Sequence, residues 1–386
     1  MLRTMIPFFI ILPAAMYSLI SWWCGRSFFA RPSHPSRTPE NSHPAAAGVT
    51  IIKPLKGMDA GSYENFASFC NQRYQGTVQL LFAVASHDDP VIPVVRQLTA
   101  DFPAMDITLV INPVIHGANY KVSNLINAYA GARHDIIIIC DSDIRVAPDY
   151  LASVTAHFRD PEVGLVTSLY RTSSVHGIAT ALEASGFTAE MIPNVLVAER
   201  LEGISFALGA SMAVRRRALE GIGGFKALAD FLADDYQLGN MVFRSGWRIA
   251  LDRCFVESMV SREQLVSVVS RQLRWARTMR ISRPGGYLAS GITQPFPAAF
   301  LACIFSPTLL SGAVTLSVLY GVRMAVCWYY SRCLVKDGLF PRWLWLLPMR
   351  DMTAFLCWAG SFLGNTVVWR GARFRLRPGG KLEELP

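Results

Sequence analysis

The sequence predicts an α/β protein in which a domain with a Rossmann-like, mostly parallel sheet is flanked by N-terminal and C-terminal transmembrane helices. Hydrophobic residues make up 52% of the 386 residues, charged residues only 17%, and the mean hydropathy is +0.29. These values are too apolar for an ordinary soluble protein and exclude a disordered or disulfide-rich chain. Residues 4–25 and 284–322 contain no charged residue, and each run is long enough to cross a bilayer core. Between them, short β-branched segments alternate with helical ones.

The first apolar run, within residues 1–25, is expected to be an N-terminal transmembrane anchor. A cleaved signal peptide carries its positive charge before the apolar stretch, and here only Arg3 does so. Trp22 and Trp23 end the run and arginines follow them, which is typical of the cytoplasmic interface of a membrane helix. Residues 26–48 are rich in Pro, Ser and His and are expected to be a linker.

The second apolar region, residues 284–370, is expected to contain about two membrane spans. They are expected at about residues 298–330, interrupted by Pro307 and Arg323, and at about residues 343–369. Arg350 and Asp351 lie inside the second span, where lone charges are costly, so they are expected to pair with each other or to sit at an interface. Two spans return the basic tail, residues 371–386, to the cytoplasmic side.

Residues 49–283 are expected to form one globular domain. Four nearly continuous β-branched runs predict strands that are buried on both faces, at residues 49–53, 78–85, 107–111 and 136–140. Helical segments separate them at residues 63–72, 92–102 and 121–130. This alternation predicts a parallel sheet, and such sheets bind ligands beyond the carboxyl ends of their strands. Polar clusters follow three of the four strands, so the functional site is expected there.

Acidic residues follow two of these strands. Asp141 and Asp143 come directly after the fourth strand, and two carboxylates one residue apart can hold Mg²⁺ or Mn²⁺ beside a phosphate. The alternative interpretation is a solvated turn. Asp89 follows the second strand and precedes Pro90, so it is either a site residue or the start of a helix. The histidines and cysteines show no metal-ligand spacing, and a site built from them is not expected.

Lysines provide cations at the same edge. Lys53 and Lys56 flank Pro54 in a turn after the first strand, and Lys121 opens a helix. A diphosphate needs such cations, and a helix start adds backbone N–H groups. The alternative is that these lysines are simply solvated.

Two further motifs lie later in the chain. Asp234 and Asp235 are either helix caps or, for one of them, a general base. Arg271, Arg274 and Trp275 can share a helix face, although a basic flank before a membrane segment would also place arginines there. The membrane flank and the tail account for most of the net charge of +9, so nucleic acid is not expected as a partner.

Taken together, five ordered motifs resemble the ceramide glucosyltransferase family. They are KPLKG (residues 53–57), HDDP (87–90), CDSDIRV (140–146), ADDY (233–236) and RQLRW (271–275). That family belongs to the nucleotide-sugar transferases with a D, D, D, (Q/R)xxRW signature. ARHDIIIICDSDIRV, KVSNLIN, LADDYQLG and LRWARTMR look most like its bacterial branch, which glycosylates hopanoids.

The resemblance implies a GT-A catalytic domain that depends on Mg²⁺ or Mn²⁺. It implies that Asp89 contacts the nucleotide and that Asp141 and Asp143 hold the metal and diphosphate. It also implies that Asp235 is the general base, with Asp234 as a helper or cap. The residues implied to close over the diphosphate and acceptor are Arg271, Arg274 and Trp275. Lys53, Pro54 and Lys121 are expected to complete the substrate site. Animal ceramide enzymes carry a histidine in the stretch that matches residues 186–197, and this chain has none.

The expected activity is therefore inverting transfer from a UDP-sugar to a membrane lipid, with N-acetylglucosamine and a hopanoid such as bacteriohopanetetrol as the substrates. The alternatives are ceramide glucosylation from UDP-glucose, a processive polysaccharide synthase, and a non-catalytic membrane scaffold. The expected location is the bacterial inner membrane, with the catalytic domain in the cytoplasm.

Overall fold

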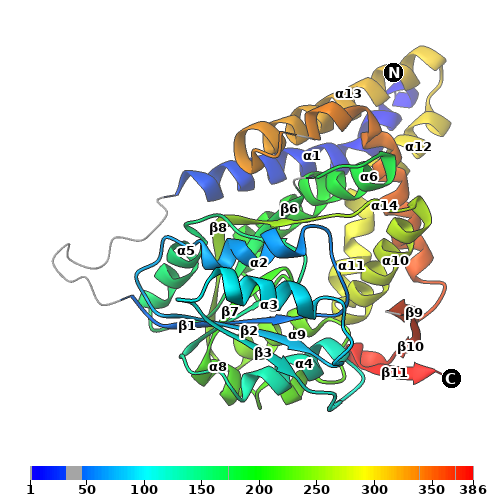
Figure 1. Ribbon diagram of the computed structural model, residues 1–386. Helices are drawn as coiled ribbons and strands as arrows, with labels where there is room; N and C mark the ends of the chain where they lie inside the picture. The colour runs from blue at the N-terminus through cyan, green and yellow to red at the C-terminus, as the bar shows by residue number, and fades with distance from the viewer. Residues whose placement is uncertain (1, 32–45, 173, 339, 370, 386) are drawn as a thin grey trace.

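The computed structural model describes residues 2–31, 46–172, 174–338, 340–369 and 371–385. Its centre is an eight-stranded sheet in the order β3-β2-β1-β4-β7-β6-β8-β5, with helices on both faces (Figure 1). The four predicted strands are present and parallel: β1 (Val49–Pro54), β2 (Val78–Val84), β3 (Asp106–Ile111) and β4 (Ile136–Cys140). The predicted helices connect them: α2 (Ser62–Cys70), α3 (Ile92–Asp101) and α4 (Tyr120–Tyr129). The predicted α/β fold with a mostly parallel sheet is confirmed.

The other half of the sheet has mixed strand directions, and the sequence motifs did not indicate it. Its strands are β5 (Ile144–Arg145), β6 (Val163–Thr172), β7 (Ser211–Arg215) and β8 (Arg248–Ser258). β7 is antiparallel to β4 and β6, β6 is parallel to β8, and β5 is antiparallel to β8. The helices around these strands are α5 (Tyr150–Ala156), α6 (Ile178–Gly186), α7 (Ile192–Glu202), α8 (Arg216–Gly221) and α9 (Asp234–Arg244), with the π-helical turn η2 (Phe187–Met191) between α6 and α7.

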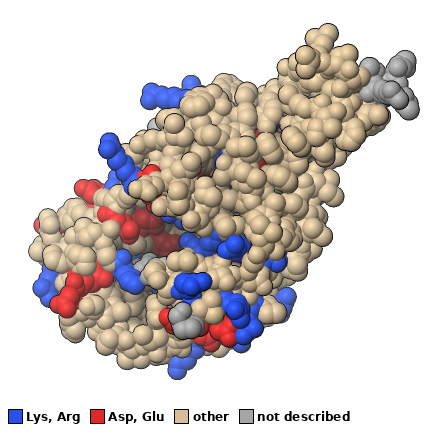
Figure 2. Space-filling model, turned by 90° about the vertical axis from the view of Figure 1, so that its right-hand side faces the viewer, with Lys and Arg blue, Asp and Glu red and all other residues tan. Residues whose placement is uncertain are grey.

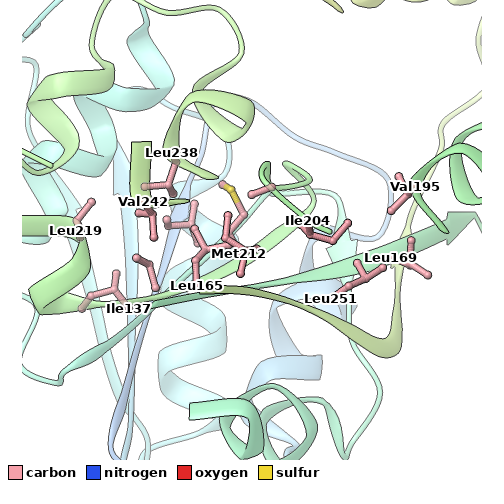
Figure 3. Close-up of a cluster of buried hydrophobic side chains, with 14 of the residues drawn as sticks. Ile137, Leu165, Leu169, Val195, Ile204, Met212, Leu219, Leu238, Val242 and Leu251 are labelled. Carbon is pink, nitrogen blue, oxygen red and sulfur yellow. The ribbon is translucent and has the colours of Figure 1, made fainter. Parts of the chain in front are cut away.

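Alternate residues of β4 enter two hydrophobic cores, one on each face of the sheet. Ile137 and Ile139 belong to one core, and Ile138 belongs to the other. Figure 3 shows the first core, in which Leu238 and Val242 of α9 pack near Ile137. Because side chains alternate along a strand, a strand covered on both faces must be apolar at every position. This explains the unbroken IIIIC run that ends at the predicted metal site.

Two helices in the described part of the chain are long and apolar enough to span a membrane, Met5–Ala30 and Leu309–Val335. The first lies in α1 (Leu2–Ala30), so the beginning of the predicted linker is helical; residues 32–45 of that linker lie outside the described residues. The second comprises α13 (Leu309–Tyr329) and the π-helical turn η5 (Tyr330–Val335). Figure 1 shows α1 and α13 side by side, projecting beyond the domain that contains the eight-stranded sheet.

The stretch expected at residues 298–330, with interruptions at Pro307 and Arg323, forms two helices, α12 (Pro295–Phe305) and α13, while Arg323 lies inside α13 without breaking it. Pro307 lies between them and cannot continue a helix. Thr308 then starts α13 through reciprocal hydrogen bonds with Ser311. The preceding segment consists of α10 (Leu265–Ser282), α11 (Pro284–Ser290) and the turn η4 (Gly291–Thr293). The stretches Pro284–Thr293 and Pro295–Phe305 are bent by 44° and form a further span only if they are counted together.

The span expected at residues 343–369 differs from the structure. This stretch contains the end of η6 (Phe340–Leu346), the 15-residue helix α14 (Leu347–Ser361) and β9 (Thr366–Trp369). A helix of that length extends only about 22 Å, which is less than the roughly 30 Å of a bilayer core. Arg350 and Asp351 do not pair with each other. Asp351 binds Arg323 of α13 at 2.6 Å, and Arg350 binds Glu190 and, at 2.7 Å, Gln272 of α10.

The expected basic tail is a folded part of the domain. It forms β10 (Ala372–Leu376) and β11 (Leu382–Leu385), and β10 pairs antiparallel with both β9 and β11. The arginines of β10 alternate with buried residues, and Phe374 packs with Leu232, just before α9. The backbone N–H of Leu382 donates to the carbonyl oxygen of Asp230 at 2.7 Å. The C-terminal sheet therefore supports the segment that carries Asp234 and Asp235.

Candidate active site

The polar residues predicted beyond the carboxyl ends of the strands converge in the structure. The ammonium of Lys121 lies 2.7 Å from Oδ1 of Asp141 and 3.4 Å from Oδ2 of Asp234. Burial alone would lower the pKa of Lys121, but these two carboxylates outweigh it and raise the pKa, so the side chain stays cationic. Figure 2 shows acidic side chains inside a hollow that has basic side chains along its rim. Lys121 thus connects the acids after β4 with those at the start of α9.

Asn119 fixes the position of Lys121. Its side-chain oxygen accepts from the backbone N–H of Val122 at 3.1 Å and so caps α4. Its amide nitrogen donates to the carbonyl oxygen of Phe231 at 2.7 Å and to Oδ1 of Asp234 at 3.4 Å. Asn119 therefore ties the start of α4 to the segment before α9. Asn119 was not among the site residues predicted from the sequence, although an Asn before a helical run is an N-cap signal.

Asp141 and Asp143 lie on the turn between β4 and β5. The hydroxyl of Ser258 donates to Oδ2 of Asp143 at 2.7 Å. Burial and the charge of Asp141 raise the pKa of Asp143 to about 6. A divalent cation at both carboxylates would remove this repulsion, so the pair suits Mg²⁺ or Mn²⁺. Among the described residues no group of three His, Cys, Asp or Glu side chains could hold a metal, so diphosphate oxygens and water would supply the other ligands.

Lys53 differs from its expected place at the mouth of the site. It is fully buried, and its ammonium donates to the carbonyl oxygen of Asp141 at 2.8 Å. It also lies over the ring of Phe69, 4.2 Å from the centroid. Burial lowers the pKa of Lys53, against the opposing effect of the nearby acids. In this structure Lys53 holds the backbone of the Asp141 turn, and Pro54 beside it is also buried.

Asp89 combines the two interpretations open from the sequence. One of its oxygens accepts from the backbone N–H of Val91 at 3.1 Å, as expected at the start of a helix. Both oxygens also accept from the N–H of Gly57 at 3.1 Å, which holds the KPLKG turn against the end of β2. Asp89 is half-buried at the same edge of the sheet as Asp141.

The two acids at the start of α9 have different surroundings. Asp234 is buried and bound to Lys121 and Asn119. Asp235 accepts from the N–H of Tyr236 at 2.7 Å, and burial followed by the charge of Asp234 raises its pKa to about 6. Oδ2 of Asp235 lies against Gly209, where an added Cβ would be only 2.8 Å away. A carboxylate with a raised pKa suits a general base, whereas a carboxylate paired with lysine suits a tether.

The arginines of α10 contact other parts of the protein. Arg271 makes bidentate contacts with Glu183 of α6 and with Glu263, at 2.6–3.0 Å. Arg277 and Arg280 donate to the carbonyl oxygens of Thr366 and Gly364 in the C-terminal region. These contacts show that the basic run is more than a flank of the membrane segment. Trp275 is partly exposed, and the carbonyl oxygen of Arg274 accepts from the Thr278 hydroxyl at 2.8 Å.

Two residues near the site were missed because no motif surrounds them. Glu183 is buried and is the partner of Arg271. Tyr170, on β6, has a pKa raised by burial and then by the charges of Asp235 and Asp141, so its phenol stays neutral. Tyr170 lies in β6, and Glu183 lies in the long connection between β6 and β7. The sequence of this region shows only an irregular apolar pattern.

Comparison with known proteins identifies the chain as a whole. The family model described as glycosyl transferase family 21 matches residues 6–382. Ceramide glucosyltransferase 1 of Caenorhabditis elegans is 27% identical over 348 residues, which cover 88% of this chain and 74% of that protein. A ceramide glucosyltransferase of Komagataella phaffii is 33% identical over 134 residues, which cover 33% of this chain and 26% of that protein.

Among solved structures, the mannosyltransferase PcManGT from Pyrobaculum calidifontis, in complex with GDP-Man and Mn²⁺, matches with a TM-score of 0.53 and 17% identity, over 93% of this chain and 99% of that one. At this identity the match shows a shared fold, which is the predicted GT-A-type glycosyltransferase fold. Because the family model covers nearly the entire sequence, the chain belongs to glycosyl transferase family 21.

Proposed function

We propose that this glycosyltransferase moves a sugar from a UDP-sugar to a hydroxyl of a membrane lipid, with inversion at the anomeric carbon. The observation that supports this most is the placement of Lys121 between Asp141 and Asp234. It puts a carboxylate pair suited to a metal–diphosphate and a carboxylate suited to a base at one edge of the sheet. The adjoining apolar helices α1 and α13 would hold that edge near a lipid acceptor.

In the proposed mechanism, Asp235 accepts the proton of the acceptor hydroxyl as the hydroxyl oxygen attacks the anomeric carbon and the bond to the diphosphate breaks. Asp141 and Asp143 would hold Mg²⁺ or Mn²⁺, which when bound would stabilise the charge of the departing diphosphate. Lys53 fixes the Asp141 turn from beneath, and Asp89 fixes the turn at Gly57. Arg271, Arg274 and Trp275 would close over the diphosphate and acceptor, which for Arg271 requires release from its glutamates.

The pH dependence of transfer follows from the two raised pKa values. Asp235 must be ionised to accept a proton, and its pKa is raised to about 6. We therefore expect kcat/KM to fall as the pH drops through about 6, instead of near 4 as for an ordinary aspartate. The check is a pH profile at saturating Mn²⁺, which suppresses the separate titration of Asp143. A rate that stays constant down to pH 5 would exclude Asp235 as the base.

Gly209 is expected to position the base. Gly209→Ala would place a Cβ 2.8 Å from Oδ2 of Asp235 and displace the carboxylate, and a misplacement near 1 Å can cost about 10²-fold in rate. The matched control is Gly221→Ala, where no neighbouring atom lies within 4 Å of the added Cβ. Turnover and thermal unfolding of both variants should be compared. Equal turnover would show that the carboxylate tolerates the displacement.

For the substrates, the proposal is N-acetylglucosamine transfer to a hopanoid such as bacteriohopanetetrol, supported by the motif resemblance. The alternative, UDP-glucose to ceramide, is supported by the similarity to ceramide glucosyltransferases. A processive polysaccharide synthase would need more spans to build a channel than the candidate spans in the described residues. The test is incubation of the purified protein with several UDP-sugars and a bacterial lipid extract, followed by mass spectrometry of the products. Absence of any glycosylated lipid would refute the proposed class of acceptor and favour a scaffold.

For location, we propose the bacterial inner membrane with the catalytic domain in the cytoplasm. Cys24 and Phe28, near the end of α1, are part of the domain's core, so the domain lies at the same end of α1 as Arg26 and Arg31. Protease added to intact spheroplasts is expected to leave the domain whole, and permeabilisation is expected to expose residues 32–45 to cleavage. Cleavage there without permeabilisation would show that the domain lies on the opposite side of the membrane.

A further inference from the structure

One face of α10 carries apolar side chains between two ion pairs. Arg271, Trp275 and Met279 follow one another at intervals of four residues on one side of α10, and Arg283 comes directly after the helix ends at Ser282. At one end Arg271 binds Glu183 of α6, and at the other Arg283 binds Glu202, the last residue of α7, at 2.7 Å. α10 is thus connected at both ends of this face to the α6–α7 segment.

The middle of this face is open. Trp275 is 37% exposed and Met279 is 61% exposed, although both are large apolar residues. Leu201, next to Glu202 on α7, is 70% exposed. Arg277 and Arg280 contact the C-terminal region instead, so their charges do not occupy this face. From Arg271 to its end at Ser282, α10 rises by about 17 Å, and Trp275 and Met279 lie within this length.

The exposed apolar series continues toward the membrane helices. After Arg283, Leu288 of α11 and Ile292 of η4 are exposed, followed by Phe300 and Ile304 of α12. Pro284–Thr293 and Pro295–Phe305 together are apolar enough to form a bent span. Figure 2 shows that, beyond the charged hollow, the surface toward the upper end of the molecule is nearly free of Lys, Arg, Asp and Glu.

We infer that this surface is the route of the lipid acceptor: its alkyl chain lies along Trp275 and Met279 of α10, opposite Leu201 of α7, with its hydroxyl toward Asp235. The inference rests on the proposed transfer to a membrane lipid and deepens it. An alkyl chain is the occupant because the exposed apolar residues run along the chain from the RQLRW motif of α10 to the bent apolar stretch Pro284–Phe305, which could enter a bilayer. The Arg283–Glu202 pair is solvent-exposed and therefore weak, so it does not bar a lipid from entering sideways.

The test uses full-length Met279→Glu and Leu201→Glu, one from each side of the route. The matched control is Val266→Glu, an exposed apolar residue on another face of α10. Initial rates are measured in mixed micelles with bacteriohopanetetrol and with C16-ceramide, each paired with UDP-N-acetylglucosamine and UDP-glucose. Because a carboxylate disfavours contact with an alkyl chain, each route variant is expected to raise the acceptor KM about tenfold relative to the donor KM. Val266→Glu is expected to match wild type.

The outcomes separate this route from the proposed function. Acceptor KM values equal to that of Val266→Glu, in a wild-type protein that glycosylates lipid, would overturn the route alone. Failure of the wild type to glycosylate either lipid or any lipid of a bacterial extract would overturn both. A variant in which the donor KM and the acceptor KM rise by the same factor would indicate a general structural change, and this result would also count against the route.

Discussion

Asp235→Asn is expected to lower the turnover number by about 10²- to 10⁴-fold, or roughly 3–5 kcal/mol, while donor affinity stays near that of wild type. Asparagine has the same shape as aspartate, and its amide oxygen can still accept the hydrogen bond from the N–H of Tyr236. The amide cannot, however, take up the proton of the acceptor hydroxyl. The raised pKa of Asp235, about 6, shows a carboxylate held in a site that disfavours its charge. Such a carboxylate takes up a proton readily near neutral pH.

The neighbouring Asp234→Asn provides the matched comparison. Asp234 is tied to Lys121 and Asn119, so its loss should resemble that of a structural contact, about 1 kcal/mol of stability. The charge of Asp234 also contributes to the raised pKa of Asp235, so the variant should shift the acidic limb of the pH profile to lower pH. Steady-state rates at saturating donor and lipid decide the matter. Equal losses in the two variants would mean that the base has been assigned to the wrong residue.

Asp143→Ala is expected to reduce sugar transfer below detection without unfolding the domain. The variant removes one of the two carboxylates that suit a divalent cation, and electrostatic stabilisation of a developing charge is often worth 10²- to 10³-fold per group. The wild-type protein should lose activity in excess EDTA and regain it with Mn²⁺. Calorimetry should show that UDP binding depends on Mn²⁺ in wild type and no longer does so in the variant.

The control for Asp143→Ala is Asp135→Ala, which lies just before the other end of the same strand. The side chain of Asp135 is 98% exposed, and its closest cation, Arg216, is 4.0 Å away. This variant should keep full activity. Full activity of Asp143→Ala, or of wild type in EDTA, would contradict the metal role.

The first four strands of the sheet could be predicted because each is marked by its own residues, an apolar run of a few positions. β1, β2 and β4 are covered on both faces, which requires nearly unbroken apolar runs, and polar residues follow each of them at one edge of the sheet. β3 lies at the edge of the sheet with its residues partly buried or exposed, so the expectation that it is buried on both faces is wrong. The same reasoning misplaced Lys53, which was expected at the mouth of the site. Lys53 belongs to β1, all of whose residues are buried, so its ammonium finds carbonyl oxygens inside the domain.

Long-range partners could not be predicted. Glu183 meets Arg271 across 88 positions of sequence, and no pattern in either segment indicates the other. The C-terminal sheet did have a signal: charged and apolar residues alternate strictly from Arg373 to Arg377, as in a strand with one buried face. The density of arginine instead suggested a basic cytoplasmic tail.

The position of the C-terminal sheet at the end of the chain affects the order of membrane insertion and folding during translation. The segment before Asp234 is held by Leu382 and Gly380, which are synthesised well over a hundred positions later. Translation delivers α1 first and α13 before β10 and β11, so both candidate spans can enter the bilayer while Asp234 and Asp235 still lack this support. The carboxylates of Asp234 and Asp235 are expected to reach their final arrangement only after residues 372–385 have left the ribosome. A nascent chain would then be anchored before its candidate active site is complete.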